Sequence, residues 1–282
     1  MKLIWEMIQF LVYSLLVVGI AKYILVPILR KLGESLNLKP KTIGFIAGIA
    51  TSVPELLTVS FSAFSGLIEA SSYNILSSNI INTIQYTASI ALNKNGKKVR
   101  HPAIIVALVF VAITIIIPLL LLLWKIDMKF YLVPIFLISF VIIYFIDRRV
   151  YLFYFKNLKT EEEKEIEEEE KKMRGKEKIT ILYAIFLLLS SIALFVVGNL
   201  LGGTLENLCY YFHIPEVIIG ILLGFVTSLP ELITFLESQK HYKKEIDQIA
   251  GVVEATNNLL TSNLLNLFII QSSGITIYTL LH

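Results

Sequence analysis

Long apolar runs, interrupted by short polar segments, dominate the chain. The run from residue 102 to 124, PAIIVALVFVAITIIIPLLLLLW, contains no charged side chain. About 20 apolar residues in a helix cross the roughly 30 Å hydrocarbon core of a bilayer, where backbone polar groups must be bonded internally. Eight candidate spans follow: residues 4–29, 41–66, 68–92, 102–124, 130–147, 179–201, 215–238 and 249–272. The pattern predicts an all-α, polytopic helical membrane protein with about eight transmembrane helices.

Composition agrees with this prediction. Hydrophobic residues make up 56% of the 282 residues, charged residues make up 17%, and the mean hydropathy is +0.73. Charges are concentrated in the segment 148–178, where the run TEEEKEIEEEEKKMRGKEK predicts either a short solvated helix or a flexible linker. The single cysteine, Cys209, excludes an internal disulfide and a cysteine-based metal cluster.

Basic residues predict the orientation in the membrane. They cluster after the first, third, fifth and seventh spans, as at Lys31, Lys98 and Lys244. Because Lys and Arg beside short loops are retained on the cytoplasmic side, the amino terminus is predicted outside and the charged linker inside. We expect an integral protein of the cell (plasma) membrane, surrounded by the lipid bilayer and without a nucleic-acid partner.

Two sequence motifs occur twice. GIATSVPE, residues 48–55, matches GFVTSLPE, residues 224–231, and NILSSNIIN, residues 74–82, matches NLLTSNLLN, residues 258–266. Five predicted spans separate the copies, so the second copy must enter the membrane from the opposite face. This is the pattern of an inverted-topology repeat, in which substrate sites lie between the repeats near the midplane.

The repeat suggests three parts. Residues 1–147 form a first membrane repeat of about five helices, residues 148–178 form a charged cytoplasmic linker, and residues 179–282 form a second, shortened inverted repeat of about three helices.

The first motif places a proline and an acid at mid-membrane. Proline removes a backbone donor, so the helix before Pro54 is expected to kink and to expose carbonyl oxygens. Thr51 and Ser52 precede Glu55 by four and three residues and share its helical face. A charge at this depth costs about 2.5 to 3.5 kcal/mol even on permissive scales, so it marks an ion pathway by default.

The second motif contributes a polar stripe. Asn74, Ser78 and Asn82 recur every four residues, and their counterparts in the other half are Asn258, Ser262 and Asn266. Oxygen ligands with two carboxylates suit a hard cation such as Ca²⁺ or Na⁺, and the lack of His and Cys in the stripes argues against Zn²⁺ or Cu⁺.

Other polar residues near the stripes have a second interpretation. Ser77, Asn79, Thr261 and Asn263 adjoin the stripe, and contacts between helices are favoured over ligation for them. Glu69 and Glu254 lie near the beginnings of the third and eighth spans, where we expect interfacial or mouth-lining roles.

These residues carry a family resemblance. ATSVPEL and VTSLPEL, each followed one span later by N-x-x-(S/T)-S-N-x-x-N, resemble the two alpha repeats of the cation/calcium antiporter superfamily, most closely its Na⁺/Ca²⁺ exchanger branch. The resemblance implies alternating access, in which Ca²⁺ and Na⁺ cross in opposite directions through one pocket. It implies no enzyme activity and no cofactor, only transported Ca²⁺ and Na⁺.

The resemblance also implies a set of ion ligands. The carboxylates of Glu55 and Glu231 would be shared between the Ca²⁺ and Na⁺ sites. Backbone carbonyls would come from Thr51 and Thr227, hydroxyls from Ser52, Ser228, Ser78 and Ser262, and further polar ligands from Asn82 and Asn266.

The chain departs from the family pattern. Glycines that are usual in the motifs are replaced by Ala50, Val226, Ser77 and Thr261. Relatives often carry an Asp where this chain has Asn82 and Asn266, so two carboxylates give a charge of −2, which one Ca²⁺ neutralises. Relatives commonly have ten spans, so we expect a partner or a homo-oligomer to cover the flank of the two absent helices.

Two other functions stay open from the residues. A H⁺/divalent cation antiporter would use the same oxygen ligands, with protonation of glutamate in place of Na⁺ binding. A non-transporting or channel-like cation-binding membrane protein would bind without exchange. The residues also leave open the stoichiometry and the choice among Ca²⁺, Mn²⁺ and Mg²⁺.

Overall fold

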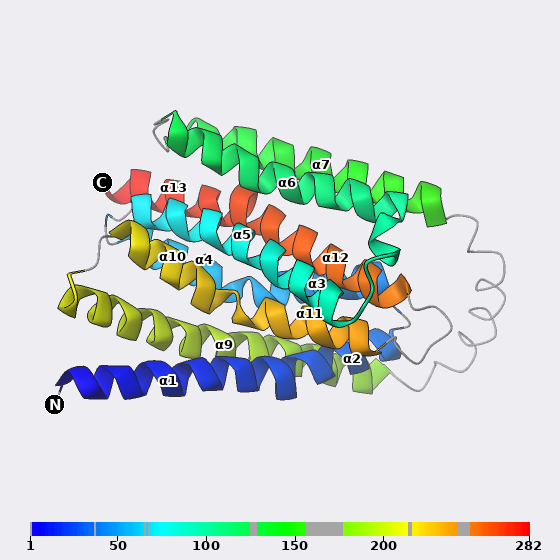
Figure 1. Cartoon of the computed structure of the whole chain (residues 1–282), viewed down its shortest axis with the longest axis horizontal. Helices are drawn as coiled ribbons and strands as arrows, with labels where there is room; N and C mark the ends of the chain where they lie inside the picture. Colours follow the sequence, from blue (N-terminus) through cyan, green and yellow to red (C-terminus); the bar gives the residue numbers. More distant parts are fainter. Residues whose placement is uncertain are drawn as a thin grey trace.

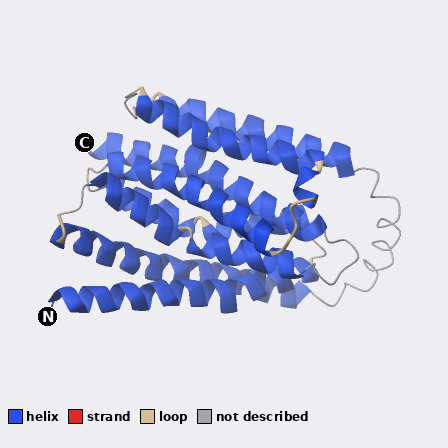
Figure 2. Cartoon of the chain, in the orientation of Figure 1, coloured by secondary structure: helices blue, strands red, loops and turns tan. Residues whose placement is uncertain are grey.

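The computed structural model describes residues 2–36, 38–64, 66, 68–124, 129–155, 177–213, 216–241 and 249–282. Every regular element among these residues is helical, as Figure 2 shows. The predicted all-α class is therefore confirmed.

The helices line up as eight rods over the described residues. The first four rods are α1, η1 and α2 (Lys2–Ile20, Ala21–Leu25, Val26–Ser35), α3 and α4 (Pro40–Thr51, Val53–Phe64), α5 (Ile68–Leu92), and α6 (Pro102–Leu123). The last four rods are α7 (Leu132–Phe155), α9 (Glu177–Tyr211), α10 and α11 (Glu216–Thr227, Leu229–His241), and α12, η6 and α13 (Ile249–Leu264, Leu265–Ile270, Gln271–Leu281). A 3-10 turn, η2 (Lys98–Arg100), precedes α6, and η1 and η6 are π-helical turns inside longer rods.

Five rods among the described residues are long and apolar enough to cross a membrane by length and composition. They are Leu3–Gly33, Pro40–Phe64, Pro102–Leu121, Ile181–Leu201 and Ile249–Leu281. The rods formed by α5, α7 and α10–α11 pack against these five. With 25 residues, α5 is about 37 Å long, enough to cross a bilayer. The prediction of about eight spanning helices is confirmed.

The exterior of the protein is apolar and its centre is polar, the reverse of a soluble protein. The side chains of Leu15, Phe153 and Leu188 are 72%, 76% and 61% exposed. Glu55 and Asn74, by contrast, expose no surface. Because hydrocarbon solvates apolar side chains but not carboxylates or amides, this distribution is the one that a bilayer requires.

Three layers of rods make up the protein (Figure 1). α6 and α7 form one outer layer, and α1 packs along α9 in the other. Between these layers lie α3–α4, α5, α10–α11 and α12–α13, with α12 packed along α3 and α10 packed along α5. The outer layers therefore flank four central rods, which carry both copies of the repeated motifs.

The central rods form two pairs with opposite directions. In Figure 1, α3–α4 runs right to left and α5 returns, whereas α10–α11 runs left to right and α12–α13 returns. The two copies of the motifs thus enter the bundle from opposite ends, as an inverted repeat requires. The division at residues 147 and 178 stays a prediction, and residues 156–176 of the linker lie outside the described residues.

Three predicted spans are too short. α7 continues past residue 147 to Phe155, α9 reaches Tyr211, and the last rod reaches Leu281. No proline occurs in these extensions, and a helix continues until a breaking or capping residue ends it. The terminal stretch GITIYTLLH therefore belongs mostly to the eighth rod.

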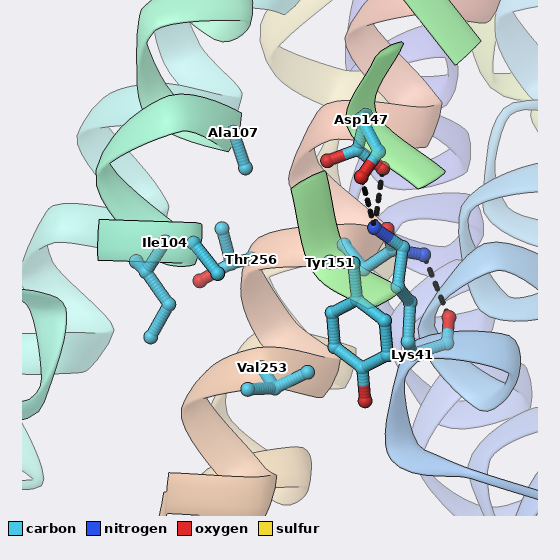
Figure 3. A pocket seen from close by; sticks show the side chains of 9 residues that line it. Lys41, Ile104, Ala107, Asp147, Tyr151, Val253 and Thr256 are labelled. Carbon is cyan, nitrogen blue, oxygen red and sulfur yellow. Dashed lines mark hydrogen bonds and ion pairs between the residues drawn. The ribbon is translucent and has the colours of Figure 1, made fainter. Parts of the chain in front are cut away.

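An ion pair joins α7 to the central rods (Figure 3). Lys41, in the first turn of α3, donates to the carboxylate of Asp147 on α7, and its ammonium lies 4.5 Å from the ring centroid of Tyr151. Asn257 of α12 donates to the carbonyl oxygen of Lys41 at 2.7 Å. These contacts hold α3, α7 and α12 together at one end of the bundle.

Candidate cation site

Two central rods break at equivalent points. Ser52, with φ −84° and ψ 2°, separates α3 from α4, and Ser228 separates α10 from α11. Pro54 and Pro230 follow two residues later, and proline has no N–H to donate to the carbonyl one turn earlier. The predicted kink is confirmed, together with its counterpart in the second half.

Each break places an acid in the first turn of the following half-helix. Glu55 lies in the first turn of α4, and Glu231 lies in the first turn of α11. Negative charge is favourable there because the helix dipole and unbonded N–H groups face it. Both side chains are fully buried. Ser52, three residues before Glu55, donates to Ser262, which donates to Glu231, so the two acid-bearing breaks lie close together inside the protein.

All ten residues predicted as ligands are buried, with exposed fractions of 3% or less. They are Thr51, Ser52, Glu55, Ser78, Asn82, Thr227, Ser228, Glu231, Ser262 and Asn266. Burial suits ligands, but it also suits contacts between helices. Hydrogen bonds decide which of their oxygens remain available.

On the Glu231 side, hydroxyl groups link the two halves. Ser52 donates from Oγ to Ser262 Oγ at 2.9 Å, and Ser262 donates to Glu231 Oε1 at 3.2 Å. Asn82 Nδ2 also lies 3.4 Å from Ser262 Oγ. One oxygen of Glu231 is thus hydrogen-bonded, through a serine that contacts the break in the other half.

On the Glu55 side, the equivalent chain of hydrogen bonds is absent from the described residues. Ser78 hydrogen-bonds instead to Asn74 Oδ1 at 3.3 Å and to the Gly224 carbonyl at 3.4 Å. Ser228 Oγ and both carboxylate oxygens of Glu55 have no hydrogen-bond partner. Related sequences have therefore produced two half-sites with different hydrogen bonding.

Among the predicted ligands, six buried oxygens have no hydrogen-bond donor. They are Oε1 and Oε2 of Glu55, Oε2 of Glu231, Oδ1 of Asn82, Oδ1 of Asn266 and Oγ of Ser228. A buried polar atom without a partner costs about 1 to 3 kcal/mol, more when charged. A cation would satisfy several of these oxygens at once, since carboxylate, amide and hydroxyl oxygens are ligands for Ca²⁺.

A matched pair of threonines supports the two acids. Thr58 donates to the Glu55 carbonyl at 3.1 Å and accepts from Asn74 Nδ2 at 2.8 Å. Thr234 repeats both contacts with Glu231 and Asn258, at 2.8 Å and 2.5 Å. These threonines tie each acid-bearing half-helix to the next rod. The sequence carried their signal, because both copies of the motif continue to a threonine, as PELLT and PELIT.

Close approach of the backbones requires glycine. A Cβ added to Gly48 would lie 2.7 Å from Thr261 Cβ and 2.9 Å from the Asn258 carbonyl. A Cβ added to Gly224 would lie 2.1 Å from Ser77 Oγ. The residues that replace the usual glycines at positions 77 and 261 therefore pack directly on the glycines of the opposite half.

Two expectations about neighbouring residues have different outcomes. Ser77, Asn79, Thr261 and Asn263 all contact the other half, so the favoured contact between helices is confirmed. The expectation that Glu254 lies close to water is wrong. Its side chain is 2% exposed and accepts from Ser238 at 2.6 Å, because α11 and α3 cover the beginning of α12.

The donor set defines the chemistry that the site can support. The described residues contain no group of three or more His, Cys, Asp or Glu side chains suited to a metal. The site therefore relies on two carboxylates and on neutral oxygens, a combination that suits hard cations. If both acids are ionised, one divalent or two monovalent cations balance their charge.

The fold and the site together define a class, that of polytopic helical membrane proteins with two oppositely inserted halves around a shared set of oxygens. The chain belongs to the sodium/calcium exchanger protein family, whose model matches residues 6–153 and 182–281. It is therefore a protein of an ion-exchanger family and not an enzyme. No curated protein matches the chain.

Solved structures of one exchanger are similar to this chain over nearly its whole length. One is the sodium-calcium exchanger NCX_Mj soaked with 100 mM Na⁺ and 10 mM Sr²⁺, with a TM-score of 0.60 and 20% identity over 98% of this chain and 83% of that one. Another is NCX_Mj soaked with zero Na⁺ and Ca²⁺, with a TM-score of 0.57, 19% identity and the same coverages. At this identity the likeness is one of fold.

Proposed function

We propose that this protein exchanges Ca²⁺ for Na⁺ across a membrane by alternating access. One observation carries the proposal: both halves contribute buried oxygens without hydrogen-bond donors, among them those of Glu55 and Glu231, and Ser52 and Ser262 link the two half-sites. Membership in the exchanger family supports the choice of ions.

The ten predicted ligands would contribute four chemical types of oxygen to the bound cation. Glu55 and Glu231 supply charge, and Asn82 and Asn266 supply amide oxygens. The remaining groups are the hydroxyls of Ser52, Ser228, Ser78 and Ser262 and the backbone carbonyls of Thr51 and Thr227, which lie where the two rods break. Backbone carbonyls beside a helix break can turn away from the helix axis and contact a bound cation.

Charge balance couples the two fluxes. Two ionised carboxylates in a low-dielectric centre repel each other. Their charge raises the free-energy barrier between the conformations open to the two sides of the membrane. Ca²⁺ or Na⁺ removes that cost, so the loaded protein changes access more readily than the empty one. An ion gradient therefore drives exchange.

Orientation follows from the basic residues. With the ends of α2, α5 and α7 in the cytoplasm, the amino terminus lies outside the cell membrane. Association with a second copy or with another membrane protein stays a prediction, which the mass of the protein in nanodiscs will test.

Flux measurements test the exchange. Liposomes that contain the purified protein and are loaded with Na⁺ should take up ⁴⁵Ca²⁺ when they are diluted into Na⁺-free buffer. They should take up little when only a pH gradient is imposed. Uptake that follows the pH gradient alone would assign the protein to H⁺/divalent cation antiport. Uptake that needs no counter-ion would assign it to a channel-like class.

Two variants connect the flux to the site. Glu55→Gln and Glu231→Gln each remove one charge from the centre and should abolish Na⁺-driven uptake. Glu237→Gln is the matched control, because Glu237 lies on the same helix as Glu231 but pairs with Lys240 in a partly exposed ion pair. Full uptake by both central variants would contradict the site.

A further inference from the structure

Two asparagines outside the predicted ligand set cross-link the halves at the centre. Asn79 of α5 and Asn263 of α12 expose no surface. Asn79 Nδ2 donates to the carbonyl oxygen of Asn263 at 3.3 Å, and Asn263 Nδ2 donates to the carbonyl oxygen of Asn79 at 3.2 Å. These reciprocal bonds join equivalent positions of the two repeats.

The bonds determine which way each amide faces. A backbone carbonyl can only accept, so the group turned toward it must be the NH₂ and not the oxygen of the amide. Asn79 Nδ2 has a second carbonyl partner, that of Thr114 at 3.1 Å. Rotation of either amide by 180° would place oxygen against oxygen. The Oδ1 atoms of Asn79 and Asn263 are therefore fixed on the opposite side of each amide.

These two oxygens orient the amides of two predicted ligands. Asn263 Oδ1 accepts from Asn82 Nδ2 at 3.3 Å, and Asn79 Oδ1 accepts from Asn266 Nδ2 at 3.1 Å. Once the NH₂ of each ligand amide is held in this way, its oxygen must face elsewhere. Oδ1 of Asn82 and Oδ1 of Asn266 are both buried and without a hydrogen-bond donor.

We infer that Asn79 and Asn263 are positioning residues, which hold Asn82 and Asn266 with their oxygens, and not their NH₂ groups, toward the transported cation. The inference rests on the proposed function. Each half orients the ligand of the other half, since Asn263 of the second repeat acts on Asn82 of the first, and Asn79 acts on Asn266.

The chemistry explains why such a device is needed. An amide is nearly symmetric in shape, but its oxygen attracts a cation and its NH₂ repels one. A carboxylate needs no such control, because both of its atoms are oxygens. A chain that uses Asn in both stripes therefore depends on neighbours to choose the correct atom.

A double-variant cycle tests the inference by equilibrium binding of ⁴⁵Ca²⁺ to the purified full chain. Loss of residues that orient metal ligands typically weakens binding by about 10 to 100-fold, so Asn263→Leu should weaken Ca²⁺ binding by about tenfold or more. In an Asn82→Asp background the same change should leave affinity unchanged or raise it, because the carboxylate no longer meets Asn263 Oδ1. A purely structural role would instead give equal losses in both backgrounds, and that result would overturn the inference.

A mirror cycle and a control complete the design. Asn79→Leu, compared in the Asn266 and Asn266→Asp backgrounds, repeats the test on the other half and replaces the first cycle if Asn263→Leu does not fold. Thr83→Val is the control, because it removes a 2.8 Å hydrogen bond to the backbone carbonyl of Asn79 and leaves the asparagine side-chain amides unchanged. It should retain wild-type affinity. Failure of the wild-type chain to bind Ca²⁺ would contradict the proposed function itself, whereas equal losses in the two backgrounds would contradict only the positioning role.

Discussion

Glu55 and Glu231 stand at equivalent points of related motifs, yet their surroundings differ. Glu231 accepts a hydrogen bond from Ser262, which in turn accepts one from Ser52 of the other half. Neither oxygen of Glu55 has such a partner. The repeat thus determines which side chains gather at the centre, while packing determines which of them remain unsatisfied. Without a bound cation, the Glu55 half carries the larger electrostatic cost.

Replacing the glycines at which the two halves approach closely should have the largest effect on uptake. Gly48→Ala places a methyl group 2.7 Å from Thr261 Cβ and 2.9 Å from the Asn258 carbonyl, and Gly224→Ala likewise meets backbone atoms, Asn74 O and Ser78 N, at 2.9 Å. Overpacking costs about 1 to 3 kcal/mol, and we expect Gly48→Ala to lie at the upper end. The yield of folded protein and ⁴⁵Ca²⁺ uptake measure the loss.

Compensation distinguishes packing from other causes. Thr261→Gly should restore part of the uptake in the Gly48→Ala variant, because it removes the opposing side chain but leaves the Asn258 carbonyl in place. Gly203→Ala on α9 is the control, since a Cβ there would meet nothing within 4 Å. Lack of rescue would show that the backbones of α3 and α12 do not pack as described.

The next effect is on the stability of the cation-free protein, which should differ between variants of Glu55 and Glu231. At alkaline pH, where both acids are ionised, Glu55→Gln removes a buried charge without hydrogen-bond partners, so it should stabilise the cation-free protein by about 1 to 3 kcal/mol. Glu231→Gln should stabilise it less, because the charged form already accepts a bond from Ser262. Apparent melting temperatures in the presence of a chelator measure the difference. Equal shifts for the two variants would contradict the claim that the two half-sites differ.

Serine substitutions sharpen the same contrast at a smaller scale. Ser262→Ala removes the donor to Glu231 and the acceptor of Ser52, so it should weaken Ca²⁺ binding by about five- to tenfold, or about 1 to 1.4 kcal/mol. Ser78→Ala removes only longer bonds, at 3.3 Å and 3.4 Å, and should weaken binding less. Competition of Ca²⁺ for ⁴⁵Ca²⁺ binding measures both. The reverse order would indicate that the Glu55 half holds the ion more firmly.

The smallest expected effect on Ca²⁺ binding concerns the contact of α3 with α7. Lys41→Met breaks the pair with Asp147, and the equivalent position of the second half is Val217, which has no charge. Asp147 is buried, so loss of its partner leaves an uncompensated charge and should lower stability by about 3 to 5 kcal/mol, whereas Ca²⁺ affinity should not change. A large loss of affinity would show that this contact, at one end of the bundle, belongs to the transport machinery.

Much of the fold followed from the sequence. The breaks at Ser52 and Ser228 were expected because Pro54 and Pro230 remove helical donors, and the stripes were expected because ligands at intervals of four share a helical face. These features depend only on local covalent geometry. The apolar rods could also be predicted, because the thickness of the bilayer sets the length of a spanning helix.

The pairing between distant residues did not follow from the sequence. The contact of Lys41 with Asp147 joins residues 106 positions apart, and the orientation of Asn82 by Asn263 depends on the register of α5 against α12. Glu254 was expected near water because it begins its span, but neighbouring rods bury it. Tertiary register, which no local period encodes, decides each of these cases.

Equilibrium binding of ⁴⁵Ca²⁺ to the purified protein tests most directly that both acids hold one ion. We predict one Ca²⁺ per chain in the wild type. Glu55→Gln and Glu231→Gln should each weaken that binding by about a hundredfold or more, roughly 3 kcal/mol, because each removes half of the compensating charge. Wild-type affinity in either variant, or two bound ions of which each variant loses only one, would contradict the shared site.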